Sequence, residues 1–231
     1  MEKFTFKKGI FDGLPICFGY FAVSFAFGIF AFGSGLDLFQ CFMVSATNVT
    51  SAGQFAAVPI MTGTGSLIEI AAGQLVINLR YSLMSVSLSQ KLDSSMGTVQ
   101  RLIVAFVNTD EVFAVASSKE GKLNKNYLYG LIITPWLGWS LGTFLGAMAG
   151  DILPRVVTNA LSLAIYAMFV AIVVPPAKKD FGVLICSFIA IAASCCFKYI
   201  KLLSSVPSGF VIIICAVIAA AVMAAVRPVE E

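Results

Sequence analysis

Long apolar runs separated by short polar connections restrict the fold of this chain more than any other feature of its sequence. Of the 231 residues, 59% are hydrophobic and 12% are charged. A transmembrane helix requires about 20 mostly apolar residues, so the chain holds roughly eight of them with little length left over. The sequence therefore predicts an all-α, polytopic membrane protein, with residues 1–231 forming one integral membrane domain.

Turn and charge signals between the runs set the expected span boundaries. The second and third spans, over residues 38–61 and 66–90, are less regular than the others. The uncharged turn Thr62–Gly65 joins them, and polar residues interrupt them. If residues 38–65 are re-entrant, the number of spans falls to seven, and the sequence leaves this alternative open. The eight-span arrangement has helices over residues 10–33, 38–61, 66–90, 99–118, 127–149, 157–175, 181–198 and 206–226.

The orientation follows from lysine and arginine, which favour cytoplasmic loops. With eight spans and a cytoplasmic N-terminus, nine basic residues lie on the cytoplasmic side and five, including Lys91 and Arg101, on the other. The seven-span alternative gives eight and six. We therefore expect eight spans with the N-terminus in the cytoplasm.

A weak internal similarity leaves two interpretations open. Gly13–Pro15 near the start of the chain resembles Gly130–Leu131 followed by Pro135, and each opens a glycine-rich span. Many transporters are built from such repeats, and a duplication would give repeat halves over residues 1–118 and 119–231. The alternative is that the glycines serve only the close packing that is common to membrane helix bundles.

Composition also excludes several function classes. The chain has no histidine, which excludes a Ser-His-Asp triad, a Cys-His dyad and histidine metal sites. No phosphate-binding GxxxxGK[ST] loop is present, and no basic stripe marks a nucleic-acid surface. The six cysteines lie in apolar runs and are expected to behave as small hydrophobic residues. We expect a protein that is not an enzyme and binds no cofactor, no metal and no nucleic acid.

Ionisable residues inside an apolar span are costly and usually mark a functional site. Glu69 and Arg80 share the run 66–90 but are eleven residues apart, about 16 Å along a helix, so they cannot pair with each other. Each needs another helix, water or a ligand as its partner. The alternative places Glu69 at the membrane surface and lets Arg80 extend to the interface.

Adjacent carboxylates occur in the run 99–118, at Asp110 and Glu111, directly after Asn108 and Thr109. Neighbouring helical positions point about 100° apart, so both carboxylates face one groove only if the helix is broken there. The pair suits proton transfer, or one carboxylate pairs with Arg80 while the other binds a cation. The alternative is that both carboxylates end a helix at an interface.

Polar side chains also crowd the run 38–61. Thr47, Thr50, Ser51 and Gln54 recur at helical spacing, which predicts one polar face. Small residues with an amide can unwind a helix and expose backbone groups to a substrate; interhelical hydrogen bonding is the alternative. At the start of the first span, Asp12 is expected to cap a helix that has Pro15 in its first turn.

Four segments of the chain, taken in order, match a known family pattern. They are Asp12–Pro15, Ala52–Ala57, Asn78–Arg80 with Leu83 and Met84, and Thr109–Glu111. This ordered set resembles the AzlC-type large subunit of branched-chain amino acid exporters. The chain departs from that pattern at Tyr81, where members often have histidine, and at Thr50–Gly53, where they tend to have Phe-Ala-Gly; both departures bear on substrate identity.

The resemblance implies a function and a partner. It implies export of leucine, isoleucine, valine and similar amino acids across the cytoplasmic membrane of a bacterium or archaeon, together with a small AzlD-type membrane subunit. A channel or a non-transporting subunit of a larger membrane complex is the alternative.

The charged and polar residues then suggest a mechanism. Arg80 would bind the substrate carboxylate, Asp110 or Glu111 the ammonium group, and Gln54 and Asn78 would complete the site. A carboxylate among Glu69, Asp110 and Glu111 would exchange protons and so couple export to the proton gradient.

Overall fold

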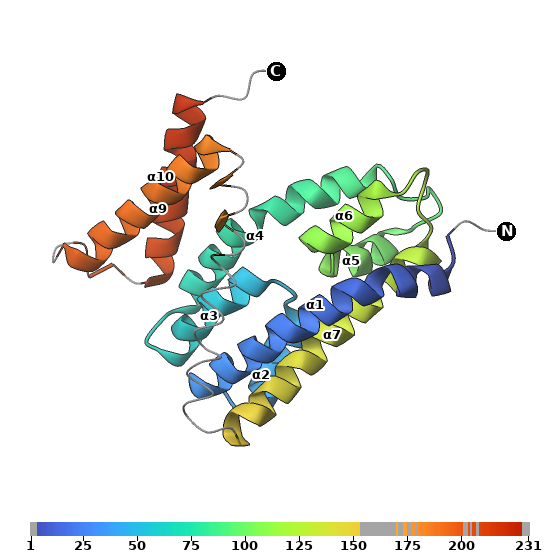
Figure 1. Cartoon of the computed structure of the whole chain (residues 1–231), viewed down its shortest axis with the longest axis horizontal. Coiled ribbons are helices and arrows are strands. Elements are labelled where there is room, and N and C mark those ends of the chain that lie inside the picture. The colour runs from blue at the N-terminus through green and yellow to red at the C-terminus, as the bar shows by residue number, and fades with distance from the viewer. Residues whose placement is uncertain are drawn as a thin grey trace. The chain divides into compact units, whose positions relative to one another are not determined.

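The computed structural model describes residues 4–152, 170, 173–174, 177–178, 180–200, 203, 205–206 and 208–227. In this part of the chain the regular structure is helical, apart from an isolated bridge between Leu92 and Leu123. The helices (Figure 1) are α1 (Phe6–Gly33), α2 (Leu38–Thr47), α3 (Ser51–Thr62), α4 (Leu67–Ser89), α5 (Thr98–Phe106), α6 (Asp110–Ser118), α7 (Lys125–Ile152), α9 (Phe181–Tyr199) and α10 (Ser208–Val226).

The chain forms two compact units. The first unit comprises Met1–Phe55 and Asn78–Ser162, and the second comprises Ala56–Ile77 and Leu163–Glu231. In the second unit α9 packs against α10. Asp180 caps the start of α9 by accepting from the Gly182 backbone N–H at 2.7 Å, and it also pairs with Arg227 after α10. The predicted repeat halves stay a prediction.

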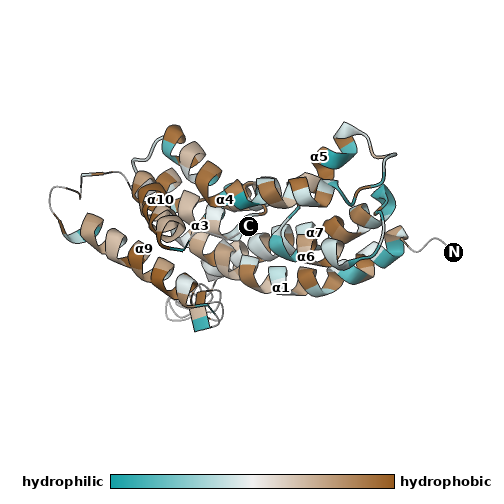
Figure 2. Cartoon of the chain, turned by 90° about the horizontal axis from the view of Figure 1, so that it is seen from above, coloured by the Kyte–Doolittle hydropathy of each residue, from teal (hydrophilic) through white to brown (hydrophobic). Residues whose placement is uncertain are grey.

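Apolar length accounts for the spans that the structure confirms. Among the described residues, Phe6–Gly33, Lys125–Gly150 and Phe181–Tyr199 are long and apolar enough to cross a membrane, and Leu38–Thr47 and Phe210–Val226 are shorter apolar helices. Figure 2 shows how apolar residues dominate α9 and α10. The all-helical membrane architecture is confirmed, whereas the predicted span 157–175 lies outside the described residues.

Helices α1 and α7 form the centre of the first unit and run side by side (Figure 1). Glycines bring their backbones together: a Cβ added at Gly9 would clash with the Tyr127 carbonyl, and one added at Gly28 with the Thr143 carbonyl. The earlier residue of α1 contacts the earlier residue of α7, and the later residue contacts the later one, so the two helices are parallel. Such close approach is a common use of glycine in membrane helix pairs.

Two of the predicted spans, 38–61 and 99–118, are each broken into two short helices. The run 38–61 divides into α2 and α3 at an extended Asn48, and the run 99–118 divides into α5 and α6 at residues 107–109. The predicted polar face at Thr47, Thr50, Ser51 and Gln54 is therefore wrong, because these residues do not share one helix. The breaks follow from poor helix formers whose side chains bond locally, as Thr50 Oγ1 does with Asn48 Oδ1 at 2.8 Å.

The start of α5 and the end of α6 lie at the same end of the first unit. The connections on either side of them lie together, because Asp93 N–H donates to the Leu123 carbonyl at 2.9 Å and Leu123 N–H to the Lys91 carbonyl at 2.8 Å. Asn124 in turn donates to the Phe4 carbonyl at 2.8 Å. The predicted span 99–118 is thus wrong: it is a hairpin of two short helices. We call the end formed by Phe4, residues 90–97 and residues 119–124 the N-terminal end.

Two lysines at the N-terminal end of the unit stabilise this hairpin, because each caps the C-terminus of a helix. Lys91 Nζ contacts the Ser117 carbonyl and donates to the Lys119 carbonyl at 2.8 Å, at the end of α6. Lys122 Nζ donates to the Gln90 carbonyl at 2.5 Å, after the end of α4. Cations stabilise the negative end of a helix in this way. Lys91 therefore lies beside Lys119, and its predicted place on the opposite side is wrong.

Candidate functional site

The starts of the short helices α3 and α6 gather most of the polar residues of interest in the first unit. Arg80 on α4 places Nη1 2.6 Å from Oδ2 of Asp110, the first residue of α6. Their side chains are 55% and 45% exposed, respectively. Solvent weakens an ion pair this open, so a competing charged group can exchange with either partner. Arg80 also donates from Nη2 to the Tyr81 hydroxyl at 3.3 Å.

The break before α6 separates the two adjacent carboxylates onto different partners. Asp110 contacts Arg80 of α4, whereas Glu111 accepts a hydrogen bond from the Tyr20 hydroxyl of α1. This divergence is the geometry expected of neighbouring positions on a helix. The start of α6 is therefore held between α4 on one side and α1 on the other.

Gln54, in the first turns of α3, is buried in a hydrogen-bonded network rather than exposed to an open cavity. Trp139 Nε1 donates to Gln54 Oε1 at 2.8 Å, and Gln54 Nε2 donates to Ser45 Oγ at 2.8 Å. Ser45 Oγ in turn lies 2.7 Å from Thr143 Oγ1. Gln54, Ser45 and Thr143 are each 0% exposed. The network fixes α2 and the start of α3 against α7.

Tyr20 and Trp139 were not predicted from the sequence, yet they connect the two helix starts. Their rings pack edge to face with centroids 5.3 Å apart. Trp136, one turn before Trp139 on α7, donates from Nε1 to the Ala46 carbonyl at 2.9 Å and so satisfies a backbone group near the end of α2. The three-residue spacing of the two tryptophans on a helix was the available signal, because it directs both rings to one side.

The two asparagines of interest lie on either side of this region. Asn108, immediately before α6, is 3% exposed and donates from Nδ2 to Ser85 Oγ of α4 at 3.1 Å. Asn78 is partly buried on α4, two residues before Arg80. Asn108 was noted only as a neighbour of the carboxylates, and the structure shows that it ties the helix break to α4.

Glu69 belongs to the second unit. It is 6% exposed and lies in the first turn of α4. Its Oε1 accepts from the backbone N–H and the hydroxyl of Ser66, each at 3.4 Å, while its own N–H donates to Ser66 Oγ at 3.2 Å. This reciprocal pattern is a helix-capping arrangement.

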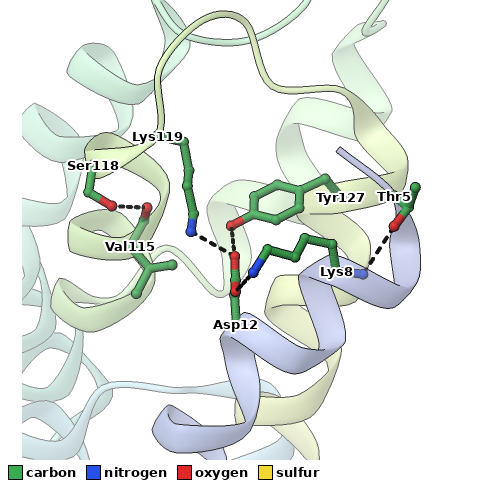
Figure 3. Close-up of polar contacts among 7 residues, drawn as sticks. All are labelled: Thr5, Lys8, Asp12, Val115, Ser118, Lys119 and Tyr127. Carbon is green, nitrogen blue, oxygen red and sulfur yellow. Dashed lines mark hydrogen bonds and ion pairs between the residues drawn. The ribbon is translucent and has the colours of Figure 1, made fainter. Parts of the chain in front are cut away.

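Asp12 is the most connected carboxylate of the described chain (Figure 3). It accepts from Lys8 Nζ at 2.7 Å, Lys119 Nζ at 2.8 Å and the Tyr127 hydroxyl at 2.9 Å. The predicted role of Asp12 as a helix cap is wrong, because α1 begins earlier and Thr5 Oγ1 accepts from the Lys8 backbone N–H. Asp12 instead joins α1, α7 and the residue that follows α6.

A pocket of about 170 Å³ lies between the second half of α4 and α5. Its exposed wall surface is almost entirely apolar, although Ser85, Ser89, Thr98, Arg101 and Asn108 are among the lining residues. Within the described ranges, no group of three or more cysteine, aspartate or glutamate side chains is placed to hold a metal ion.

Comparisons with known proteins identify the family. The model of the AzlC protein family matches residues 15–153, which extends the resemblance beyond Glu111 through α7. A protein of Archaeoglobus fulgidus, described as an uncharacterized membrane protein, is 33% identical over 175 residues, covering 75% of this chain and 76% of its own. The inner membrane protein YgaZ of Escherichia coli is 30% identical over 174 residues, covering 72% of this chain and 71% of its own. No solved structure matches. The chain therefore belongs to the AzlC family of membrane proteins.

Proposed function

We propose that this protein is a secondary transporter that exports branched-chain or other apolar amino acids across the cytoplasmic membrane, coupled to the proton gradient. Family membership supports a membrane role, and the contact between Arg80 and Asp110 at the start of α6 carries the proposal. An amino acid presents a carboxylate and an ammonium group a few bonds apart. A half-exposed guanidinium–carboxylate pair offers a partner of opposite charge for each.

In the proposed exchange the substrate replaces the internal ion pair. Its carboxylate takes the place of Asp110 on Arg80 through a charge-assisted contact, and its ammonium group binds Asp110 or Glu111. The apolar pocket beside Asn108 accommodates the aliphatic side chain. Proton coupling is assigned to a carboxylate among Glu69, Asp110 and Glu111.

The arrangement of the helices supports a membrane topology with two re-entrant segments. Helices α1 and α7 are parallel, and α4 ends at the N-terminal end, where α1 begins. Helix α4 is one continuous helix of 23 residues, about 34 Å long. Its length suffices to cross the membrane, although it is not among the three described helices that are both long and apolar enough to do so. We therefore propose that α2–α3 and α5–α6 each leave and return on one side, from opposite faces of the membrane.

Charge distribution agrees with this topology. If residues 157–175, 181–198 and 206–226 each cross once, only Arg155, Lys198 and Lys201 lie on the outer side. The ratio of inner to outer basic residues rises to eleven to three, against nine to five for eight spans. This is a stronger inside excess, with the N-terminus in the cytoplasm. The inner residues are Lys3, Lys7, Lys8, Lys91, Arg101, Lys119, Lys122, Lys125, Lys178, Lys179 and Arg227.

We include a small AzlD-type membrane subunit in the proposal as the partner. The test is efflux of radiolabelled leucine from cells that express the chain with and without that subunit, in the presence and absence of a proton uncoupler. Saturable efflux that requires Arg80 and falls with the uncoupler supports the proposal. Flux that does not saturate indicates the alternative, a channel.

Arg80→Ala is the diagnostic variant, and Lys125→Ala is its control. Lys125 also carries a positive charge in the first unit, but it lies at the exposed start of α7 and is not among the residues that line the pocket. We expect Arg80→Ala to abolish leucine efflux and Lys125→Ala to retain it. Wild-type efflux from correctly inserted Arg80→Ala would overturn the proposed site.

A further inference from the structure

We propose that Tyr20 and Trp139 are positioning residues that connect the start of α6 to the start of α3. Through them, a change in the hydrogen bonding of Glu111 alters the position of the Gln54 amide. The inference builds on the proposed function, since it treats both helix starts as parts of one transport site. We call the four residues Glu111, Tyr20, Trp139 and Gln54 the aromatic bridge.

The first link joins α6 to α1. The Tyr20 hydroxyl donates to Glu111 Oε2, and this is the hydrogen bond by which α1 holds the carboxylate. Arg80 faces Asp110 from α4 instead. The Tyr20 ring position therefore depends on whether Glu111 accepts its hydroxyl or turns to another partner, such as a substrate ammonium group.

The second link joins α1 to α7. The Tyr20 ring meets the Trp139 indole at 5.3 Å and an interplanar angle of 71°. Trp139 is 2% exposed, so its indole has little free space. In a close-packed interior a ring that moves displaces its neighbour, which makes the indole sensitive to a shift of the Tyr20 ring.

The third link joins α7 to α3. Trp139 donates to Gln54 Oε1 at 2.8 Å, and Gln54 completes its contacts through Ser45 and Thr143. These three polar residues are fully buried, and a buried network of this kind tolerates few arrangements. A displaced indole therefore changes the position of the Gln54 amide, on the helix that begins at the other break.

Tryptophan fluorescence tests the bridge without requiring transport. The chain has two tryptophans, so Trp136→Phe leaves Trp139 as the sole reporter. In purified Trp136→Phe protein we expect Glu111→Gln to shift the Trp139 emission maximum, because Tyr20 contacts both Glu111 and Trp139. The matched control is Asp110→Asn, which removes the neighbouring carboxylate that binds Arg80 and is expected to leave the emission unchanged.

Tyr20→Phe supplies the decisive comparison, because it keeps the ring and removes the hydroxyl. In the Trp136→Phe, Tyr20→Phe background we expect Glu111→Gln to have no further effect on emission. Equal shifts from Glu111→Gln and Asp110→Asn, no shift from either, or a full shift in the Tyr20→Phe background would each overturn the bridge. If Tyr20→Phe protein does not fold, the comparison of Glu111→Gln with Asp110→Asn decides alone.

Leucine transport then separates this inference from the proposed function. In wild-type background, we expect Tyr20→Phe and Trp139→Phe each to raise the KM for leucine, and the double variant to raise it no further than the more severe single variant. Fold-changes that multiply in the double variant contradict a shared bridge. Absence of leucine transport by the wild-type protein refutes the proposed function, whereas the emission shifts still decide the bridge.

Discussion

The ammonium group of Lys119, which follows α6, lies 2.8 Å from the Asp12 carboxylate of α1. Lys91 binds the carbonyl of the same lysine at 2.8 Å. The C-terminal end of α6 is thereby attached to α1 by charge and to the α4–α5 connection by a capping ammonium group. The first turn of α6, in contrast, is held by the contacts of Asp110 with Arg80 and of Glu111 with Tyr20, which the proposed substrate would replace.

The Asp12–Lys119 pair predicts a measurable coupling. The two side chains are only 13% and 27% exposed, so Asp12→Asn and Lys119→Met should each cost about 1.5–3 kcal/mol of stability. Because they remove the same contact, the double variant should lose less than the sum of the two. Thermal unfolding in detergent measures this, with Lys125→Met, on exposed α7 surface, as the control. Strictly additive losses would contradict the pairing.

Glycine packing between α1 and α7 predicts a position-dependent effect of alanine. Gly28→Ala drives a methyl group into the backbone of α7 at Thr143 and should destabilise the protein by about 1–3 kcal/mol. Gly19→Ala, on the same helix, adds a methyl group with no atom within 4 Å and should be neutral or slightly stabilising. A lower Tm for Gly28→Ala alone is expected; equal Tm values would argue against the parallel pair.

The hydroxyl of Ser45 is needed to complete the buried network around Gln54. Ser45→Ala leaves Gln54 Nε2 and Thr143 Oγ1 without this partner, so a loss of about 1–3 kcal/mol is expected. Ser87→Ala, on exposed α4 surface, provides the matched control. Chemical denaturation of both purified variants measures the difference, and an unchanged midpoint for Ser45→Ala would refute the network.

The hairpin of α5 and α6 predicts the labelling side of two loops. In a background without native cysteines, Ser94→Cys and Glu120→Cys should react with a membrane-impermeant thiol reagent from the same side, because residues 90–97 and 119–124 are hydrogen bonded together. Ser34→Cys, after α1, should react from the other side. Labelling of positions 94 and 120 from opposite sides would restore the eight-span arrangement.

Sequence patterns predicted the long helices well and the broken ones poorly. Apolar length alone identifies α1, α7 and α9, because nothing but a helix satisfies backbone groups over such a stretch. Apolar composition, however, continues through both breaks. The signal that was present at the second break is Thr109 followed by two acidic residues, which is typical of a helix start. A broken helix and helix-terminal carboxylates were considered there only as alternatives, and the structure places both carboxylates in the first turn of α6.

The residues of the candidate site were likewise predicted only in part. Arg80 and Asp110 were both selected as costly charges in apolar segments, and the structure brings them into contact. Tyr20 was not selected, since aromatic residues are common in any buried helix, and the spacing of Trp136 and Trp139 was the only signal for Trp139. Asp12 was misassigned because its partners Lys119 and Tyr127 are more than 100 positions away and only the tertiary fold brings them together.

The glycine-lined contact between α1 and α7 has a mechanical consequence. Where two backbones touch directly, there are no long side chains whose rotamers could change to let one helix slide along the other. The α1–α7 pair is therefore expected to move as one rigid body. In the proposed transporter, the conformational change would be confined to the short helices that pack against this pair.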